Sequence, residues 1–307
     1  MSKDGKIEFS ILIGRVSTED HDRILQALAS LRAQEGGHRY EVVIADRLHD
    51  EVSKKIAAEF PEATLIPCPD DTTLPDMRTR ALEAATGGII IVTEDHCVPT
   101  RNWLASFAAA IAKAPADALA IGGAVENGVA DTALDWATFL CEYSGSIAPA
   151  PEGIVNDVPG MNVAYRRAAF DGVDPAVLRK GFWETTLHPV IRANGKKLFS
   201  SDAIRLDHCK KFSLGLFCRQ RYVYSRYFAG IRFEKDQYAK RATAALLSLA
   251  LPPLLLWRMR GNVARKNRLG QEFLRASPYL ALFVVIWAAG EIVGYIAGPG
   301  DALAEIE

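Results

Sequence analysis

Three side chains that could bind a metal ion follow one apolar run in this sequence. Residues 89–99 read IIIVTEDHCVP, in which Glu94, Asp95 and His96 come directly after β-forming residues. In an extended chain, residues 94 and 96 point to one side and residue 95 to the other. A carboxylate and an imidazole on one side could hold a divalent cation such as Mn²⁺, which in turn holds phosphate oxygens. A polar strand end with solvated side chains is the open alternative.

A second run of the same letters lies further along the chain. Asp207, His208 and Cys209 repeat the order of Asp95, His96 and Cys97. We do not expect one zinc site built from both runs, because adjacent side chains on a strand diverge and the spacing fits no usual zinc motif. A structural histidine held by hydrogen bonds remains the alternative for His208.

The elements that must position these residues alternate between strands and helices. Apolar patterns predict strands at residues 7–13, 40–45, 63–66 and 89–93, and helices at residues 19–33, 51–60 and 77–85. Ser17 or Thr18 is the expected N-cap of the first helix. Such alternation predicts βαβ units and a mostly parallel sheet, whose ligand site lies beyond the carboxyl ends of the strands. Asp46 and residues 94–96 fall at such ends.

The composition sets limits on the class of protein. The chain has 307 residues, of which 49% are hydrophobic and 24% charged, an ordinary globular mixture. A formal net charge of −1 gives no support for a nucleic-acid partner. The five cysteines form no CxxC pair, which suits a reducing compartment. The first residues lack a basic region followed by an apolar region, so we expect no export of the N-terminal part.

Two apolar segments near the C-terminus, residues 242–257 and 278–298, predict membrane-inserted helices. We therefore expect a catalytic domain at residues 1–235 in the cytosol and a membrane-associated region at residues 236–307. If both segments crossed, the basic loop 258–277 would lie outside, against the positive-inside rule. Three arrangements stay open: only the second segment crosses, both cross, or the two rest as a hairpin in one leaflet.

Residues 77–99 carry a resemblance to a known family. The stretch MRTRALEAATGGIIIVTEDHCVP resembles glycosyltransferase family 2, whose members have a glycosyltransferase-A fold and a DxD motif after a strand. Here that motif is the variant at residues 94–96. The resemblance implies that His96 ligates a metal, that Glu94 or Asp95 contacts the ribose or the metal, that Asp46 binds the base or ribose, and that Arg78 lies near the diphosphate.

Downstream segments extend the resemblance over most of residues 7–235. Residues 159–170 are similar to the acceptor-side segment of the family, which places Gly160 and Asn162 beside the acceptor. Residues 181–195 resemble the xED segment, with Glu184 as its Glu and Thr185 in place of its Asp. Threonine cannot act as a general base at neutral pH. Glu184 is therefore the predicted base. A shift of register by one residue, an acceptor that needs little base assistance, and a purely structural charge at a helix N-terminus are the alternatives.

Two further residues are assigned by the same resemblance. A histidine after the xED segment often completes the metal site in this family, and His208 is in that position. Residues 220–232 are loosely similar to a QxxRW segment, which puts Arg221 on the acceptor side. The interleaved arginines and tyrosines of this stretch also suit a helix at lipid headgroups or a solvated amphipathic helix.

Together these features predict an α/β protein of glycosyltransferase-A type with C-terminal membrane helices. We expect a nucleoside-diphosphate sugar as donor, Mn²⁺ or Mg²⁺ as cofactor and inversion at the anomeric carbon. We also expect a lipid-linked or envelope-polysaccharide acceptor, at the inner membrane. A nucleotide-binding scaffold with weak catalysis is the alternative. A nucleotidyltransferase is less favoured, because residues 13–16 (IGRV) contain only one glycine.

Overall fold

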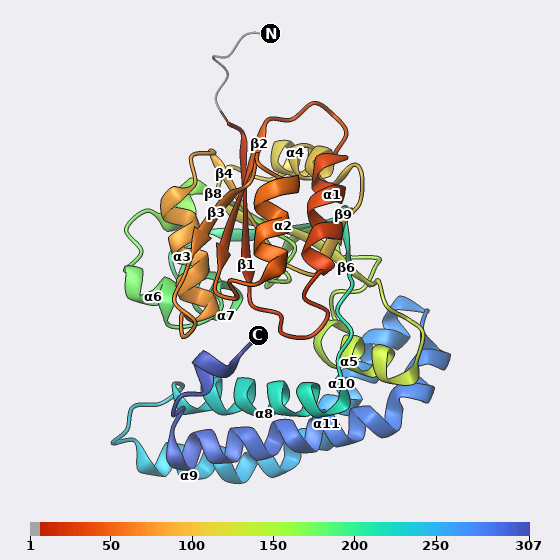
Figure 1. Cartoon of the computed structure of the whole chain (residues 1–307). Helices are drawn as coiled ribbons and strands as arrows, with labels where there is room; N and C mark the ends of the chain where they lie inside the picture. Colours follow the sequence, from red (N-terminus) through yellow and green to blue (C-terminus); the bar gives the residue numbers. More distant parts are fainter. Residues whose placement is uncertain (1–6) are drawn as a thin grey trace. The chain divides into compact units, whose positions relative to one another are not determined.

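The computed structural model describes residues 7–307 (Figure 1). The chain divides into two compact units, each with its own internal contacts. Unit 1 comprises Met1–Gly128 and Ser146–Lys210, and unit 2 comprises Val129–Gly145 and Lys211–Glu307. The sequence predicted a catalytic domain at residues 1–235 and a membrane-associated region at residues 236–307. That functional division differs in kind from a division by internal contacts, and it stays a prediction.

Unit 1 is built on a mixed sheet in which, among the described residues, nine strands take part. The strands are β1 (Phe9–Arg15), β2 (Tyr40–Asp46), β3 (Thr64–Pro67), β4 (Ile89–Glu94), β5 (Cys97–Pro99), β6 (Ala118–Asn127), β7 (Gly153–Val155), β8 (Val163–Arg166) and β9 (Lys197–His208). Their order is β3-β2-β1-β4-β8-β6-β9-β5, with β7 paired to β9. Strands β5, β7 and β8 run against the others, so the sheet is mostly parallel, as the sequence predicted.

Helices cover this sheet, with α1 and α2 in front of it in Figure 1. The helices of unit 1 are α1 (Arg23–Arg32), α2 (Glu51–Glu59), α3 (Leu74–Ala84), α4 (Trp103–Lys113), the 3-10 helix η1 (Arg167–Phe170), α6 (Pro175–Arg179) and α7 (Trp183–Ala193). Strand β1 is buried along its whole length because both of its faces are covered. The predicted α/β class is therefore confirmed.

The start of α1 differs from the sequence-based expectation. The helix begins at Arg23 after the N-cap residue Asp22, so the predicted N-cap at Ser17 or Thr18 is wrong. The physical reason is that the Ser17 hydroxyl donates a hydrogen bond to Asp95 Oδ1 at 2.7 Å. That hydroxyl is thereby held at the carboxyl end of the sheet and does not cap a helix.

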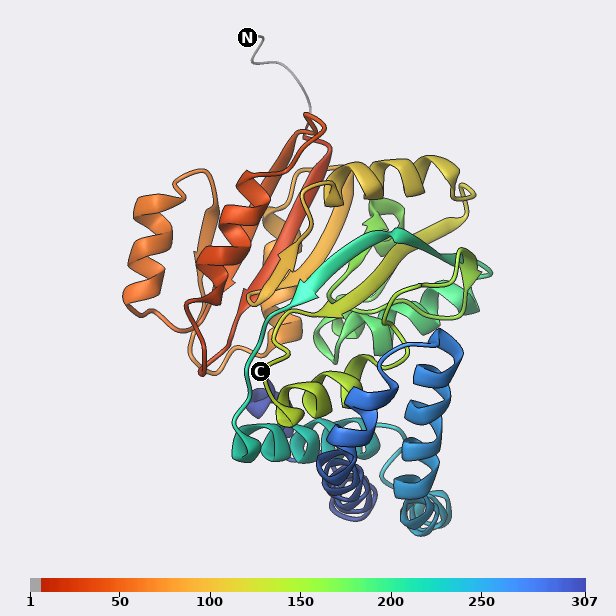
Figure 2. The same ribbon diagram turned by 90° about the vertical axis from the view of Figure 1, so that its right-hand side faces the viewer.

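The end of β9 returns the chain to the carboxyl end of β4. Strand β9 runs parallel to β6 and antiparallel to β5, and Figure 2 shows it beside β6. In the β5 pairing, Cys97 lies opposite His208. The backbone N–H of Cys209 also donates to the carbonyl oxygen of His96 at 2.9 Å. This register brings two distant segments together at one point.

Unit 2 is entirely helical in its described residues. Its elements are α5 (Ala133–Tyr143), α8 (Leu214–Gly230), α9 (Tyr238–Leu247), η2 (Ser248–Ala250), α10 (Leu251–Lys266), α11 (Gly270–Ala297) and η3 (Ala302–Glu305). The stretches Tyr238–Lys266 and Gly270–Ala297 are long and apolar enough to cross a membrane, judged by length and composition alone. The two predicted apolar segments coincide with these stretches except for Gly298, which caps α11. Pro252 and Pro253 fall in the first turn of α10, where a missing N–H is tolerated.

Candidate active site

Three side chains with metal-ligating atoms meet at the carboxyl ends of β4 and β9. Ligand atoms of Glu94, His96 and His208 all lie within 4.8 Å of one another. His96 Nε2 is 3.0 Å from His208 Nε2 and 3.3 Å from Glu94 Oε2. Two histidine nitrogens and a carboxylate oxygen form a donor set that suits a borderline divalent cation such as Mn²⁺. The residues present therefore fit the predicted metal.

Asp95 lies behind this cluster and holds it in place. Its Oδ2 accepts hydrogen bonds from the backbone N–H groups of Val16 and Ser17, at 2.9 and 3.0 Å. Its Oδ1 accepts from the Ser17 hydroxyl and lies 2.8 Å from His96 Nδ1. A carboxylate on Nδ1 orients the ring and leaves Nε2 as the ligand atom. Asp95 thus has the position of a support for His96, and a direct contact with the donor stays a prediction.

The charges of the cluster are strongly coupled. Burial alone would raise the pKa of Glu94, but the hydrogen bond and charge of His96, with the charge of Arg78, lower it to about 2. Burial would lower the pKa of His96, yet its hydrogen bonds to Asp95 and Glu94 raise it. Burial and the neighbouring His96 hold the pKa of His208 well below its usual range. The neighbouring carboxylates therefore favour the protonated form of His96, whereas burial and His96 favour the uncharged form of His208.

Arg78 on α3 connects the metal cluster to the predicted base. Its guanidinium nitrogens lie 3.4 Å from Glu94 Oε1 and 3.7 Å from Glu184 Oε2, while its carbon lies 5.2 Å from the centre of the Phe182 ring. The side chain is 1% exposed. Among the described residues, Arg78 Nε, Arg78 NH1 and Glu184 Oε2 are buried atoms without a hydrogen-bond partner. Unsatisfied polar atoms of this kind are costly, and they are typical of ligand sites.

Glu184 lies in the first turn of α7. Burial raises the pKa of this carboxyl, and the charge of Arg78 opposes the rise, although 23% of the side chain remains exposed. Gly160 leaves the room for it, because a Cβ at Gly160 would lie 2.2 Å from Glu184 Oε2. The two residues that the sequence assigned separately to base and acceptor are therefore in direct contact.

Asn162 serves the scaffold in this structure. It is fully buried, and its Nδ2 donates to the carbonyl oxygen of Ala124 at 2.7 Å. Its Oδ1 accepts a hydrogen bond from Trp103 Nε1 at 2.8 Å. These bonds join the start of β8 to β6 and α4. A contact with an acceptor would have to replace them, so that role of Asn162 stays a prediction.

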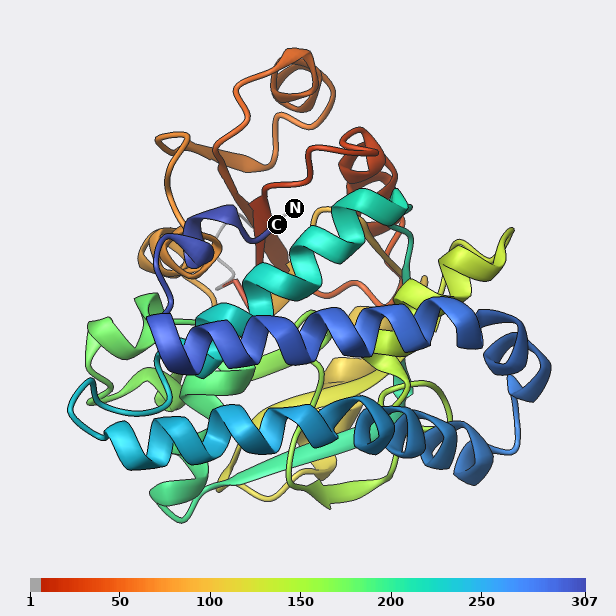
Figure 3. The ribbon, with the colours of Figure 1, turned by 90° about the horizontal axis from the view of Figure 1, so that it is seen from below.

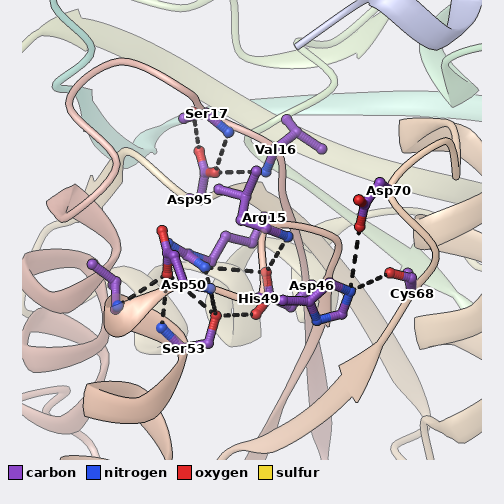
Figure 4. A network of polar contacts seen from close by, with 12 residues as sticks. Arg15, Val16, Ser17, Asp46, His49, Asp50, Ser53, Cys68, Asp70 and Asp95 are labelled. Atoms are coloured by element: carbon purple, nitrogen blue, oxygen red, sulfur yellow. Dashed lines mark hydrogen bonds and ion pairs between the residues drawn. The ribbon is translucent and has the colours of Figure 1, made fainter.

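Asp46 ends β2 inside a polar network (Figure 4). Arg15, which is fully buried, donates to Asp46 Oδ1 at 3.1 Å and forms an ion pair with Asp50 at 2.7 Å. The Ser53 hydroxyl donates to Asp46 Oδ2 at 2.6 Å. Contact between Asp46 and a nucleotide would have to add to these bonds or replace them.

The comparisons with known proteins identify the family. A family model described as Glycosyl transferase family 2 matches residues 18–173, slightly more than half of the 307 residues. The chain belongs to glycosyl transferase family 2. The resemblance predicted from the sequence is thereby confirmed. A search of curated proteins found no match.

Solved structures with similar folds support the fold of this family 2 glycosyltransferase. Mannosyltransferase PcManGT from Pyrobaculum calidifontis, in complex with GDP-Man and Mn²⁺, has a TM-score of 0.55 at 16% identity, over 94% of this chain and 88% of its own. GalNAc-T7 with UDP, GalNAc and Mn²⁺ has a TM-score of 0.49 at 18% identity, over 68% and 44%. S. aureus TarS with UDP-GlcNAc has a TM-score of 0.48 at 14% identity, over 95% and 92%. The first likeness shows a shared fold, and the other two are too distant to add to it.

The sequence did not predict a place in the candidate site for three residues, Lys210, Ser17 and Arg15. Lys210 is 2% exposed, and its Nζ donates to the Ser17 hydroxyl at 3.2 Å, next to Asp95. Arg15 anchors Asp46 as described above. Lys210 follows His208 by two residues, which is the only local signal that could have drawn attention to it. For Ser17 and Arg15, the relevant contacts depend on the fold.

Arg221 lies on α8 in unit 2. It forms an ion pair with Glu142 at 2.7 Å, and its guanidinium carbon lies 5.3 Å from the centre of the Trp287 ring. Its side chain is 8% exposed. These contacts join α8 to α5 and α11. The predicted role at the acceptor stays a prediction.

Proposed function

We propose that this family 2 glycosyltransferase moves a sugar from a nucleoside-diphosphate sugar to a lipid-linked or envelope-polysaccharide acceptor, with inversion and with Mn²⁺ or Mg²⁺. The observation that carries the proposal is the cluster of Glu94, His96 and His208, whose ligand atoms lie within 4.8 Å at the carboxyl ends of β4 and β9. The GDP-Man and Mn²⁺ held by PcManGT support a nucleotide-sugar donor and a divalent metal.

The residues around the cluster have distinct tasks in this proposal. When bound, the divalent ion would reduce the cost of placing negative charge on the leaving diphosphate. Glu94, His96 and His208 would hold that ion, and Asp95 keeps His96 in the orientation that exposes Nε2. Arg78 offers buried N–H groups to the donor, and Asp46 would bind its base or ribose. The choice of sugar and base depends on the shape of the pocket.

Glu184 is the proposed general base. An ionised carboxylate can accept the proton of an acceptor hydroxyl as that oxygen attacks the anomeric carbon. A raised pKa makes the carboxylate a better proton acceptor than an ordinary glutamate, provided that it remains ionised at the working pH. Thr185, at the position of the family aspartate, is exposed and takes no part.

The C-terminal helices support the proposed location of the reaction. Two stretches are long and apolar enough to enter a membrane, which supports a membrane-associated enzyme and an acceptor presented at that surface. Because we expect the nucleotide-sugar donor to be in the cytosol, we place the catalytic domain at the cytoplasmic face of the inner membrane. The alternative of a nucleotide-binding scaffold predicts binding without transfer.

Calorimetric titration of the full-length protein with UDP, GDP and dTDP, each with and without Mn²⁺, tests the proposal. We expect one nucleotide to bind in a metal-dependent way, and His96→Ala to abolish that dependence. His21→Ala, an exposed histidine in the loop before α1, is the matched control. Binding that ignores both Mn²⁺ and His96 would refute the metal site. Binding without turnover of any sugar donor would favour the scaffold.

A further inference from the structure

The exposed apolar side chains of this chain are concentrated on three helices. Ten of the twelve large hydrophobic side chains exposed in the described residues belong to residues 238–297. On the first stretch, Leu246, Leu249 and Trp257 are 65 to 71% exposed. On α11, Leu274, Val285 and Ile296 are 55 to 72% exposed. An apolar concentration of this kind marks an interaction surface.

The exposed face of α11 is apolar, unlike the solvent-facing side of a helix in a soluble domain. Its exposed positions recur every three or four residues, and from residue 278 onward they carry no charge. The one charged residue of that part, Glu291, turns inward and accepts hydrogen bonds from Trp287 Nε1 at 3.2 Å and the Ser248 hydroxyl at 3.5 Å. The inner face of α11 is otherwise apolar as well, with Leu280, Phe283 and Val284 buried, so both faces of this part are apolar. The surroundings of this outer face must be apolar.

The inner face of α11 is fixed to α8 at backbone distance. A Cβ at Gly290 would lie 2.1 Å from the Ser225 hydroxyl, and one at Gly294 would lie 2.3 Å from the carbonyl oxygen of Arg226. Figure 3 shows α11 between α8 and the antiparallel stretch α9–α10. Helix α8 carries the charged residues Arg219, Arg221 and Arg226. If α11 crossed a bilayer, it would draw these arginines into the hydrocarbon core, which is costly.

The C-terminal tail, which follows α11, is bound to the first half of α8. The Glu305 carboxylate forms an ion pair with Arg219 at 2.9 Å. The carbonyl oxygen of Glu305 accepts a hydrogen bond from Gln220 Nε2 at 3.0 Å. The N–H of Glu307 donates to Gln220 Oε1 at 3.0 Å. The tail therefore runs from the end of α11 back to the beginning of α8. If α11 crossed without α8, the tail and α8 would lie on opposite sides of the membrane, and these bonds could not form.

Basic residues border the apolar surface. Lys240 and Arg241 precede the first apolar stretch, and the turn between α10 and α11 is flanked by Arg258, Arg260, Arg265, Lys266, Arg268 and Arg275. Lysine and arginine beside an apolar helical face match anionic lipid headgroups. The uncharged part of the first stretch has 16 residues, residues 242–257, and spans about 24 Å, less than the roughly 30 Å of a hydrocarbon core.

We propose that α9–α10 and α11 form an in-plane membrane-binding surface. The apolar stripes enter the boundary between headgroups and acyl chains of an anionic leaflet, and neither helix crosses. Both the basic turn and the C-terminus remain on the side of α8. This inference rests on the membrane association proposed above, but it does not require sugar transfer, so either can fail without the other.

Labelling of an introduced cysteine tests the topology in full-length protein. Asp301→Cys places a thiol in the exposed tail, Gln271→Cys places one in the first turn of α11, beside the basic turn, and Glu51→Cys places one on α2 as a reference. With sealed membrane vesicles of both orientations and a membrane-impermeant maleimide, we expect the three thiols to react from the same side. The unmodified chain, whose five cysteines are mostly buried, gives the background. Reaction of Gln271→Cys or Asp301→Cys from the side opposite to Glu51→Cys would overturn the proposal.

Binding to lipid vesicles tests the occupant of the surface. We expect sedimentation with vesicles of phosphatidylcholine and 30% phosphatidylglycerol. Val285→Glu or Leu246→Glu should weaken this binding at least about tenfold, because each replaces an exposed aliphatic group that would enter the acyl chains by a charge. Ile154→Glu, on an exposed aliphatic side chain of β7, should not. Unchanged binding of both variants would exclude this surface. A lipid-free dimer that Val285→Glu dissociates, without vesicle binding, would assign the surface to a second copy instead.

Discussion

Asp95 Oδ1 lies 2.8 Å from His96 Nδ1, and the same carboxylate accepts two backbone hydrogen bonds from the loop after β1. One side chain therefore connects that loop to the orientation of the His96 imidazole, a proposed metal ligand. The middle residue of the variant motif supports the third, while the first and third face the metal position. Loop conformation and metal affinity should change together when Asp95 is altered.

Asp95→Asn tests this coupling. The amide keeps the size of the carboxylate but removes its charge and one acceptor, so His96 loses its fixed tautomer. We expect Mn²⁺ affinity to fall by about 10- to 100-fold, the usual effect of removing an outer partner of a ligating histidine. Titration calorimetry measures the change. Asp70→Asn, at a side chain that is 92% exposed, should leave the affinity intact. An unchanged affinity in Asp95→Asn would show that His96 needs no such support.

His208→Ala separates a ligand from a structural histidine. Removing the third donor should reduce bound Mn²⁺, followed by electron paramagnetic resonance, while the thermal midpoint changes little. If His208 were only structural, the melting temperature would fall and Mn²⁺ binding would persist in the folded fraction. His21→Ala again serves as the exposed control.

Glu184 should govern the acid side of the pH profile. The carboxylate must be ionised to accept a proton, and burial raises its pKa in the folded protein. Activity should therefore fall with decreasing pH at a higher pH than an ordinary glutamate, whose pKa is about 4.3. Glu184→Gln should lower kcat by at least about 100-fold with little change in donor KM, and the remaining activity should lose this limb. If activity of Glu184→Gln still fell at the same low pH, the titrating group would be a residue other than Glu184.

Arg78 should affect both donor binding and this same limb. Its charge lowers the pKa of Glu184, so Arg78→Gln should move the acid limb to still higher pH. Donor KM should also rise, since the buried N–H groups are lost. Arg78→Lys keeps the charge without the forked geometry of the guanidinium. It should therefore leave the acid side of the pH profile nearly unchanged, while the donor KM still rises. A normal donor KM in both variants would remove Arg78 from the donor site.

Asn162→Ala distinguishes a scaffold residue from an acceptor contact. The change leaves the buried Trp103 N–H and the Ala124 carbonyl unsatisfied, so the free energy of unfolding should fall by about 1–3 kcal/mol for each group. Denaturant titration measures this loss, and Asn156→Ala, at an exposed position, is the control. Full stability with a raised acceptor KM would instead support the predicted acceptor role.

The local pattern of apolar residues was sufficient to predict the first four strands of the sheet. The alternation of apolar runs predicted β1 to β4 within a few residues, and it placed Asp46 and Glu94 at strand ends because these positions follow from chain order alone. The predicted contribution of His208 came from the family resemblance. Its position 3.0 Å from His96 depends on the register that sets Cys97 opposite His208, which no local pattern indicates.

Contacts across long sequence separations explain what the sequence did not reveal. Ser17 has the composition of an N-cap, but its hydroxyl bonds to Asp95, 78 residues away. Asn162 matched a family motif, yet its amide is committed to Trp103 and Ala124. Composition predicted an apolar helix over residues 278–298, but it could not indicate that Gly290 and Gly294 bring one face of that helix close to α8.

Because Gly160 has no side chain, a substitution there offers a way to stop the reaction after both substrates have bound. A methyl group there would occupy the place of Glu184 Oε2, and the flexible end of the glutamate can swing aside with little disturbance of the backbone. Gly160→Ala should therefore displace the carboxylate that we propose as the base, without a substitution at any of the proposed metal or donor ligands. Such a variant is suited to trapping an intact donor and acceptor together, which a working enzyme would consume before they could be seen.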